Sequence, residues 1–157
     1  MRTAEAAAVR YFLDTEYNGG GGALLSLALV PDDGEELYLT LGWDGHLEEW
    51  VERNVVPYLD HVPDSLQAPR LSRKDAADVV SAYLASDPAP EIVADWPEDI
   101  AQFNALLLIG PGLMVPTPPL TFQLVPLPNY SVAENSAVPH NALHDARALR
   151  DHLLMLE

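Results

Sequence analysis

Two apolar runs close to the start of the chain constrain its fold more than any other feature. Residues 9–15 (VRYFLDT) and 23–30 (ALLSLALV) are rich in β-forming side chains, and four glycines at 19–22 separate them. The turn sequence PDDG follows at 31–34, and residues 36–42 form a further candidate strand. Short apolar runs bounded by glycine and proline turns predict strands. We therefore expect the chain to open with an antiparallel three-strand meander.

Helices and short strands alternate after this meander. The further elements predicted are helices at 46–55, 72–87, 97–107 and 141–155, and strands at 91–94 and 121–125. Trp50 is expected on the apolar side of the first helix, and Ser72 caps the second, with Asp75 completing a variant capping box. Six prolines exclude a long regular element from residues 109–128. The order predicts an α/β fold with one central mixed sheet flanked by helices, in a single domain over residues 1–157 with 1–8 as a leader.

Composition excludes several classes of site and location. The chain has no cysteine, which excludes disulfides and thiolate metal sites, so any metal must be held by oxygen or imidazole. No apolar run approaches the ~18 residues of a transmembrane helix. The first nine residues lack the long apolar core of a signal peptide. We expect a cytoplasmic protein that has no membrane partner.

The strong negative charge opposes a nucleic-acid partner. The formal net charge is −16, from 24 acidic and 8 basic residues, whereas nucleic acids prefer basic surfaces. Bound divalent cations would offset part of this charge. Basic residues also occur in two local groups, which are Arg70, Arg73 and Lys74, and Arg147 and Arg150. An enzyme that grips only a few terminal nucleotides needs few phosphate contacts.

An Asp-x-Glu pair, Asp14 and Glu16, lies at the end of the first predicted strand. Residues two apart on a strand point to the same face, so the two carboxylates can converge on one cation. Placing two acids on one side of an apolar strand is costly unless they are paired or bind metal. The alternative is a solvated strand end beside the glycine turn.

A second acidic position opens the helix at 97–107. Asp99 shares a helix face with Phe103 and Leu106, which directs its carboxylate toward the core. A first-turn acid that favours the helix dipole is the structural alternative. Asp95 competes for the same role, but its spacing from Glu98 fits a capping box. Asp99 is therefore the preferred site residue, with Asp95 as a cap or a supporting residue.

His140 and Asp145 form the third element, at the start of the last helix. Pro139 holds His140 just before that helix, where the imidazole is free to move as a general base requires. Its ordinary pKa of about 6.5 suits proton transfer near neutrality. Asp145 falls in the first turns and can reach inward to a metal. A lone histidine beside a helix is otherwise a capping or solvated residue.

These three segments together resemble the DEDDh exonucleases. The resemblance rests on FLDTE at 12–16, an acid at a helix start, and HNALHDA at 140–146 before a C-terminal helix. It is strongest to the polyadenylate-specific exoribonuclease AS family, which also has a one-domain length, a DTE opening and a proline-rich stretch before a His-x-Ala-Leu-x-Asp-Ala motif. It covers nearly the whole chain after residue 9. In the middle segment DWPEDIAQF (95–103) replaces the commoner pattern, which has an asparagine and an aromatic residue ahead of the acid, so Asp95 stays open as an alternative to Asp99.

The resemblance implies a ribonuclease H-like fold and a 3′→5′ exoribonuclease that acts on the 3′ end of single-stranded RNA. It also implies two Mg²⁺ or Mn²⁺ ions held by Asp14, Glu16, Asp99 and Asp145, with His140 as the general base. Carboxylates without thiols suit these hard cations. Two alternatives are a DNA exonuclease of the same fold and a binding module that keeps the fold without turnover.

Other segments give weaker expectations. The candidates for substrate binding are Thr15, Ser26, Leu27 and Trp96. The glycines at 19–22 lack the lysine and Ser/Thr of a phosphate loop, so a hairpin is expected there. His144 is expected to point away from the site. The apolar block at 106–115 is either ordinary core or the interface of a homodimer, as in related exonucleases.

Overall fold

The fold is built on one mixed sheet, which the computed structural model describes within residues 9–157; the leader expected at 1–8 lies outside the described residues. The five strands, in spatial order, are β3 (Leu37–Thr40), β2 (Leu24–Pro31), β1 (Arg10–Tyr17), β4 (Glu91–Ala94) and β7 (Thr121–Leu124). β1, β2 and β3 pair antiparallel, whereas β4 pairs parallel with both β1 and β7. The predicted α/β class, central mixed sheet and antiparallel opening are therefore confirmed.

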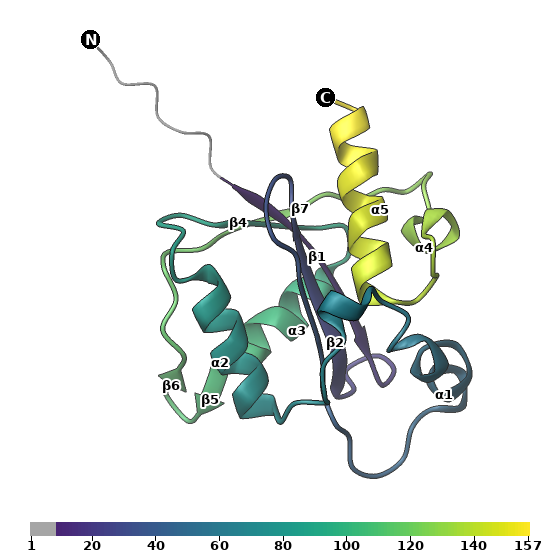
Figure 1. Cartoon of the computed structure of the whole chain (residues 1–157), viewed down its shortest axis with the longest axis vertical. Coiled ribbons are helices and arrows are strands. Elements are labelled where there is room, and N and C mark those ends of the chain that lie inside the picture. The colour runs from purple at the N-terminus through teal and green to yellow at the C-terminus, as the bar shows by residue number, and fades with distance from the viewer. Residues whose placement is uncertain (1–8) are drawn as a thin grey trace.

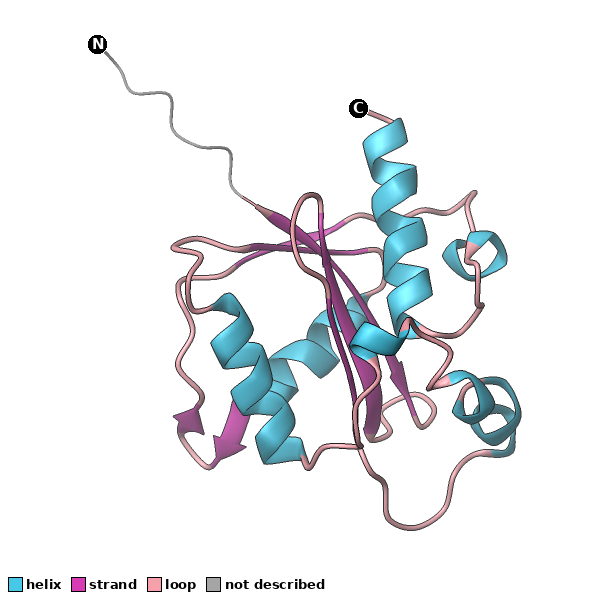
Figure 2. Cartoon of the chain, viewed as in Figure 1, coloured by secondary structure: helices cyan, strands magenta, loops and turns pink. Residues whose placement is uncertain are grey.

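Helices flank the sheet, as Figures 1 and 2 show. They are α1 (Glu49–Asn54), α2 (Arg73–Leu84), α3 (Pro97–Leu107), α4 (Val132–Asn135) and α5 (Ala142–Met155), with single 3₁₀ turns at Val56–Tyr58 and Asp64–Leu66. The Ser72 side chain accepts a hydrogen bond from the backbone N–H of Asp75, which bears out the predicted cap of α2. Among the described residues, none of the helices has both the length and the apolar character that crossing a bilayer requires.

Strand alternation assigns the two faces of the sheet to different helices. Leu13 packs in the core cluster that contains Ala76 of α2 and Phe103 of α3. Its neighbour Phe12 packs instead against Leu149 of α5. Because successive side chains of a strand point to opposite faces, α2 and α3 lie on one side of β1 and α5 lies on the other. Covering both faces explains why every residue of β2 is buried.

The short helix α1 differs from the prediction. It spans six residues rather than ten, and Trp50 is 53% exposed instead of facing the core. Val51 and Val55 fill the core position, packed against Leu25 of β2. The ring of Trp50 meets the ring of His140 edge to face, with centroids 4.9 Å apart. The prediction for Trp50 was wrong because one and a half turns give too little periodicity to fix the buried side.

The apolar block at 106–115 divides into two parts. Leu106, Leu107 and Val115 are buried, in agreement with ordinary core. The middle of the block forms a small antiparallel hairpin of β5 (Leu108–Gly110) and β6 (Leu113–Met114), whose large apolar side chains are exposed. The homodimer suggested for this block stays a prediction.

Candidate metal centre

The end of β1 supplies the first two acids of the site. Asp14 and Glu16 lie on the same side of β1 as Phe12, which is the side that α5 covers. The intervening Thr15 points to the opposite side, toward α3. Its backbone N–H and its hydroxyl donate to Asp99 Oδ1 at 3.1 and 2.6 Å. Thr15 thus fixes Asp99 against the end of β1.

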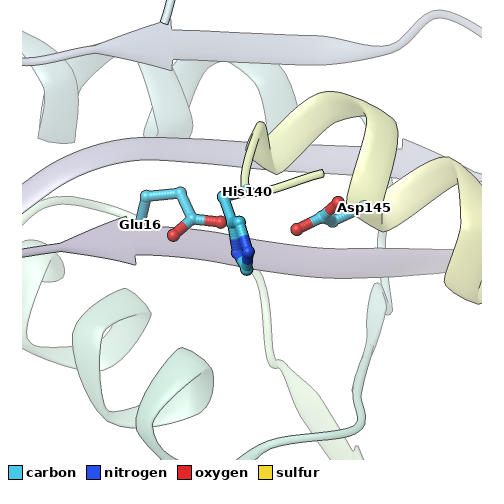
Figure 3. Close-up of side chains that lie close together, drawn as sticks. All are labelled: Glu16, His140 and Asp145. Atoms are coloured by element: carbon cyan, nitrogen blue, oxygen red, sulfur yellow. The ribbon is translucent and has the colours of Figure 1, made fainter. Parts of the chain in front are cut away.

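Two groups of three potential ligands meet at this end of the sheet. Glu16, His140 and Asp145 each offer an atom within 4.8 Å of the others, and so do Asp14, Asp95 and Asp99. Figure 3 shows the Glu16 carboxylate on one side of the His140 ring and the Asp145 carboxylate on the other, both directed toward it. The five residues expected from the sequence are brought together, and Asp95 joins them. Each group is of a kind that can hold a metal ion.

Asp95 has a different place from the one expected. Trp96 is the N-cap residue of α3, and no side chain caps that helix. The predicted capping box between Asp95 and Glu98 is therefore wrong. Pro97 at the first helical position needs no cap of its own, because proline has no N–H to satisfy. Asp95 follows the last residue of β4 and lies beside Asp14 and Asp99.

Two carboxylate oxygens of the site are buried without a hydrogen-bond partner. They are Oδ2 of Asp14 and Oδ1 of Asp145. A buried carboxylate oxygen without a donor is costly when it carries charge, so such groups in folded proteins are paired or bind a metal. No lysine or arginine side chain forms an ion pair with either acid within residues 9–157. A divalent cation fits both the orphaned oxygens and the oxygen-rich ligand set.

Burial and mutual repulsion make these acids unusually reluctant to ionise. Burial, with the charges of Asp145 and Asp99, raises the pKa of Glu16 to about 9. Burial also raises the pKa of Asp99 to about 7, although the Thr15 hydrogen bonds lower it in part. The pKa of Asp14 is raised well above its ordinary value by burial and by the charges of Asp99 and Glu16. The cluster therefore holds protons near neutral pH unless cations replace them.

The pKa of Asp145 is raised like those of the other acids of the site, whereas the pKa of His140 is lowered. Burial raises the pKa of Asp145 to about 6, against the lowering effect of the Ser136 hydroxyl and the His140 backbone amide. Burial lowers the pKa of His140 below its ordinary 6.5, because the charged imidazolium loses hydration. The imidazole is therefore neutral at pH 7 and able to accept a proton.

The His140 backbone is held in a left-handed conformation with φ of 64°, which is uncommon for a residue with a side chain. The next residue, Asn141, caps α5 by accepting from the backbone N–H groups of Leu143 and His144. Its amide also donates to the Tyr58 carbonyl at 2.8 Å. These contacts anchor the start of α5 and so position both His140 and Asp145. The His144 ring turns away from the site to the His61 carbonyl, as expected.

A cavity of about 670 Å³ opens beside the acids. Its walls are largely apolar and aromatic, and its lining includes Tyr17, Trp96, Leu127, Tyr130 and Val132. Asp14, Asp95, Asp99 and Asp145 line it as well. Trp96 is 59% exposed. Of the four expected substrate-binding residues, Thr15 and Trp96 line the cavity, whereas Ser26 and Leu27 are 0% exposed within the sheet and line no part of it. The expectation for Ser26 and Leu27 is corrected, because β2 is covered on both faces.

Sequence reasoning missed Tyr17 and the segment at 126–133, which line the cavity, and it gave Asp95 only as an alternative to Asp99 or as a cap or supporting residue. The prolines at 126 and 128 follow directly after β7. Loops that follow parallel strands gather at one edge of a sheet, where ligand sites form. The sequence shows the prolines after β7, but it does not show that β7 pairs parallel with β4. Without that pairing, the loop could not be placed at the site.

The two basic groups noted in the sequence are largely neutralised by acids. Arg70 pairs with Asp60 and Lys74 with Asp78. Arg147 and Arg150 both pair with Glu36. Neither group therefore forms a basic surface that could bind several phosphates.

No protein-family model and no curated protein matches the chain.

Proposed function

We propose that the chain is a metal-dependent 3′→5′ exoribonuclease of the DEDDh type, with a ribonuclease H-like fold. The observation that carries the proposal is the meeting of Asp14, Glu16, Asp99, Asp145 and His140 at one end of β1, with two buried carboxylate oxygens that lack partners. The mixed sheet, antiparallel from β1 to β3 and parallel beyond β1, agrees with the fold that the motif resemblance implies. The motifs and the geometry thus support the same function.

The reaction proposed is hydrolysis of the terminal phosphodiester. The carboxylates of the two ligand groups would hold Mg²⁺ or Mn²⁺, and two such ions supply activation of water and stabilisation of the departing oxygen. The neutral imidazole of His140 accepts a proton from the attacking water. The water oxygen bonds to phosphorus and the bond from phosphorus to the 3′-oxygen breaks. The departing oxygen takes a proton from solvent and becomes the 3′-hydroxyl of the shortened strand. The other product is a nucleoside 5′-monophosphate.

The direct test is nucleotide release from labelled RNA. With Mg²⁺ or Mn²⁺ present, we expect stepwise release of nucleoside monophosphates from the 3′ end. Chromatography of the products measures this release. EDTA is expected to stop release, because it removes the ions that would activate the water and stabilise the departing oxygen. A parallel DNA substrate distinguishes the DNA exonuclease alternative. Full activity in EDTA, or binding of metal and nucleotide without any turnover, would contradict the proposal.

Replacing His140 distinguishes two roles for its imidazole, which are general base and metal ligand. We expect His140→Ala to lower kcat by about 10²–10⁴-fold, the usual contribution of a positioned base. Metal affinity, measured by calorimetry, should change little because the carboxylates remain. His46→Ala is the matched control, since His46 is exposed and its described hydrogen bond uses the backbone carbonyl. A collapse of metal affinity in His140→Ala would show that the imidazole is a ligand instead of a base.

A further inference from the structure

The basic side chains of the surface are almost all engaged. The chain has eight Lys and Arg residues, and Arg2 lies outside the described part. Six of the other seven form ion pairs with acids, and they are Arg10, Arg53, Arg70, Lys74, Arg147 and Arg150. Between residues 9 and 157, Arg73 is the one basic side chain without such a pair. Arg73 and Glu98 both line a second pocket, which none of the acids of the metal centre lines.

This arrangement is unsuited to following a polynucleotide backbone. Proteins that track a strand neutralise several phosphates with Lys and Arg, and each such contact contributes to the salt dependence of binding. No Lys or Arg lines the cavity beside the metal centre. With a net charge of −16, every additional phosphate outside the site would meet repulsion. Long nucleic acid therefore gains little from this surface beyond its terminal residues.

The cavity beside the acids offers a different kind of contact. Tyr17, Trp96 and Tyr130 line it together with Leu127 and prolines, so its walls suit the faces of nucleobases. Stacking of a base on an aromatic side chain contributes about 1–3 kcal/mol and needs no charge. A volume of about 670 Å³ is in the range of sites that enclose a small organic ligand. Asp14, Asp99 and Asp145 line the same cavity, so a base held there lies next to the reacting phosphate.

We propose that the substrate is a dinucleotide or a similarly short oligonucleotide, with a base stacked on Trp96 in this cavity. Affinity then comes from stacking and from the metal centre, rather than from contacts along a phosphate backbone. The inference rests on the proposed exonuclease function and specifies the length of its substrate. It explains how an acidic surface and a nucleotide-hydrolysing site occur in one chain, because a short substrate brings few phosphates outside the site.

Substrate length and salt dependence test this proposal together. We expect kcat/KM for a dinucleotide to equal or exceed that for a long single-stranded RNA with the same 3′ sequence. Between about 50 and 200 mM salt, kcat/KM should fall by no more than about threefold, the change that one phosphate contact produces. A long RNA that is preferred more than tenfold, with a steep loss at the higher salt, would overturn the substrate proposal and leave the exonuclease function standing. Absence of release from both substrates in Mg²⁺ and Mn²⁺ would overturn both.

Trp96→Ala tests the position of the base. We expect KM for the dinucleotide to rise by about 5- to 100-fold, as loss of one stacking contact predicts, with Mn²⁺ affinity unchanged by calorimetry. Trp96 is exposed and its side chain caps no helix, so the variant should fold. Met155→Ala, which removes an exposed apolar side chain at the end of α5, is the control and should leave KM unchanged. An unchanged KM in Trp96→Ala would overturn the stacking site.

Discussion

Asp14→Asn should abolish nucleotide release and at the same time stabilise the metal-free protein. Loss of a carboxylate that is proposed to hold the metal should lower kcat by about 10²–10³-fold or more. Asp14 lies buried beside Asp99 and Glu16, which raises its pKa because the ionised form is disfavoured there. Asparagine has nearly the same shape without the charge. In EDTA at pH 8 we expect a gain of about 1–3 kcal/mol, which is an increase in Tm of roughly 2–10 °C for a chain of this size.

The same change at an exposed acid is the control for the effects of Asp14→Asn on nucleotide release and on stability. Asp78 on α2 is exposed and pairs with Lys74 four residues earlier. Asp78→Asn should leave nucleotide release unchanged and shift stability by less than about 0.5 kcal/mol, because exposed pairs contribute little. Thermal unfolding and initial rates on both variants give the comparison. A lower Tm in Asp14→Asn would mean that the carboxylate stabilises the fold, and persistent release would remove Asp14 from the proposed mechanism.

The sheet could be predicted because its signals are local. The apolar runs at 9–15 and 23–30 flank a glycine turn, and hairpin pairing follows from neighbours in the chain. The cap of α2 by Ser72 is also local, since it joins residues three positions apart. Residue alternation similarly predicted that Asp14 and Glu16 share a face of β1.

The rest of the site depends on contacts between distant segments. Alternation assigns side chains to two faces, but it does not say that α5 covers the face of Asp14 while α3 covers the face of Thr15. Asp95 was ranked behind Asp99, as a cap or supporting residue, because its spacing from Glu98 fitted a capping box, whereas its neighbours in space come from β1 and α3. The burial of Ser26 and Leu27 also depends on both faces of β2 being covered. A sequence pattern predicts local geometry, whereas tertiary packing decides which helix covers which face of the sheet.

Without added metal, the unfolding temperature is expected to fall as the pH rises from about 5 to 9. The folded-state pKa values of Glu16, Asp99 and Asp145 are raised to about 9, 7 and 6, above the ordinary 4.5, 3.8 and 3.8. In this window the unfolded chain has released protons that the native state retains, so stability decreases with pH. The contribution is fully present below about pH 4 and is lost as the pH passes the folded-state values. Glu36 and Asp60, whose pKa values are lowered by arginine, stay ionised throughout and do not produce this slope.

Metal should reverse the loss, because Mn²⁺ or Mg²⁺ competes with protons for the same oxygens. After a discount for solvent screening, we expect a metal-free difference of about 2–3 kcal/mol between pH 5 and pH 8, or roughly 5–10 °C in Tm. Saturating Mn²⁺ should raise Tm strongly at pH 8 and little at pH 5, where protons already neutralise the cluster. Scanning calorimetry across this range measures how Tm changes with pH in EDTA and in Mn²⁺. Glu16→Gln is expected to reduce the change of Tm with pH in EDTA. A Tm that is constant or rises from pH 6 to 9 in EDTA, or a metal shift equal at both pH values, would show that these carboxylates are not the cation site.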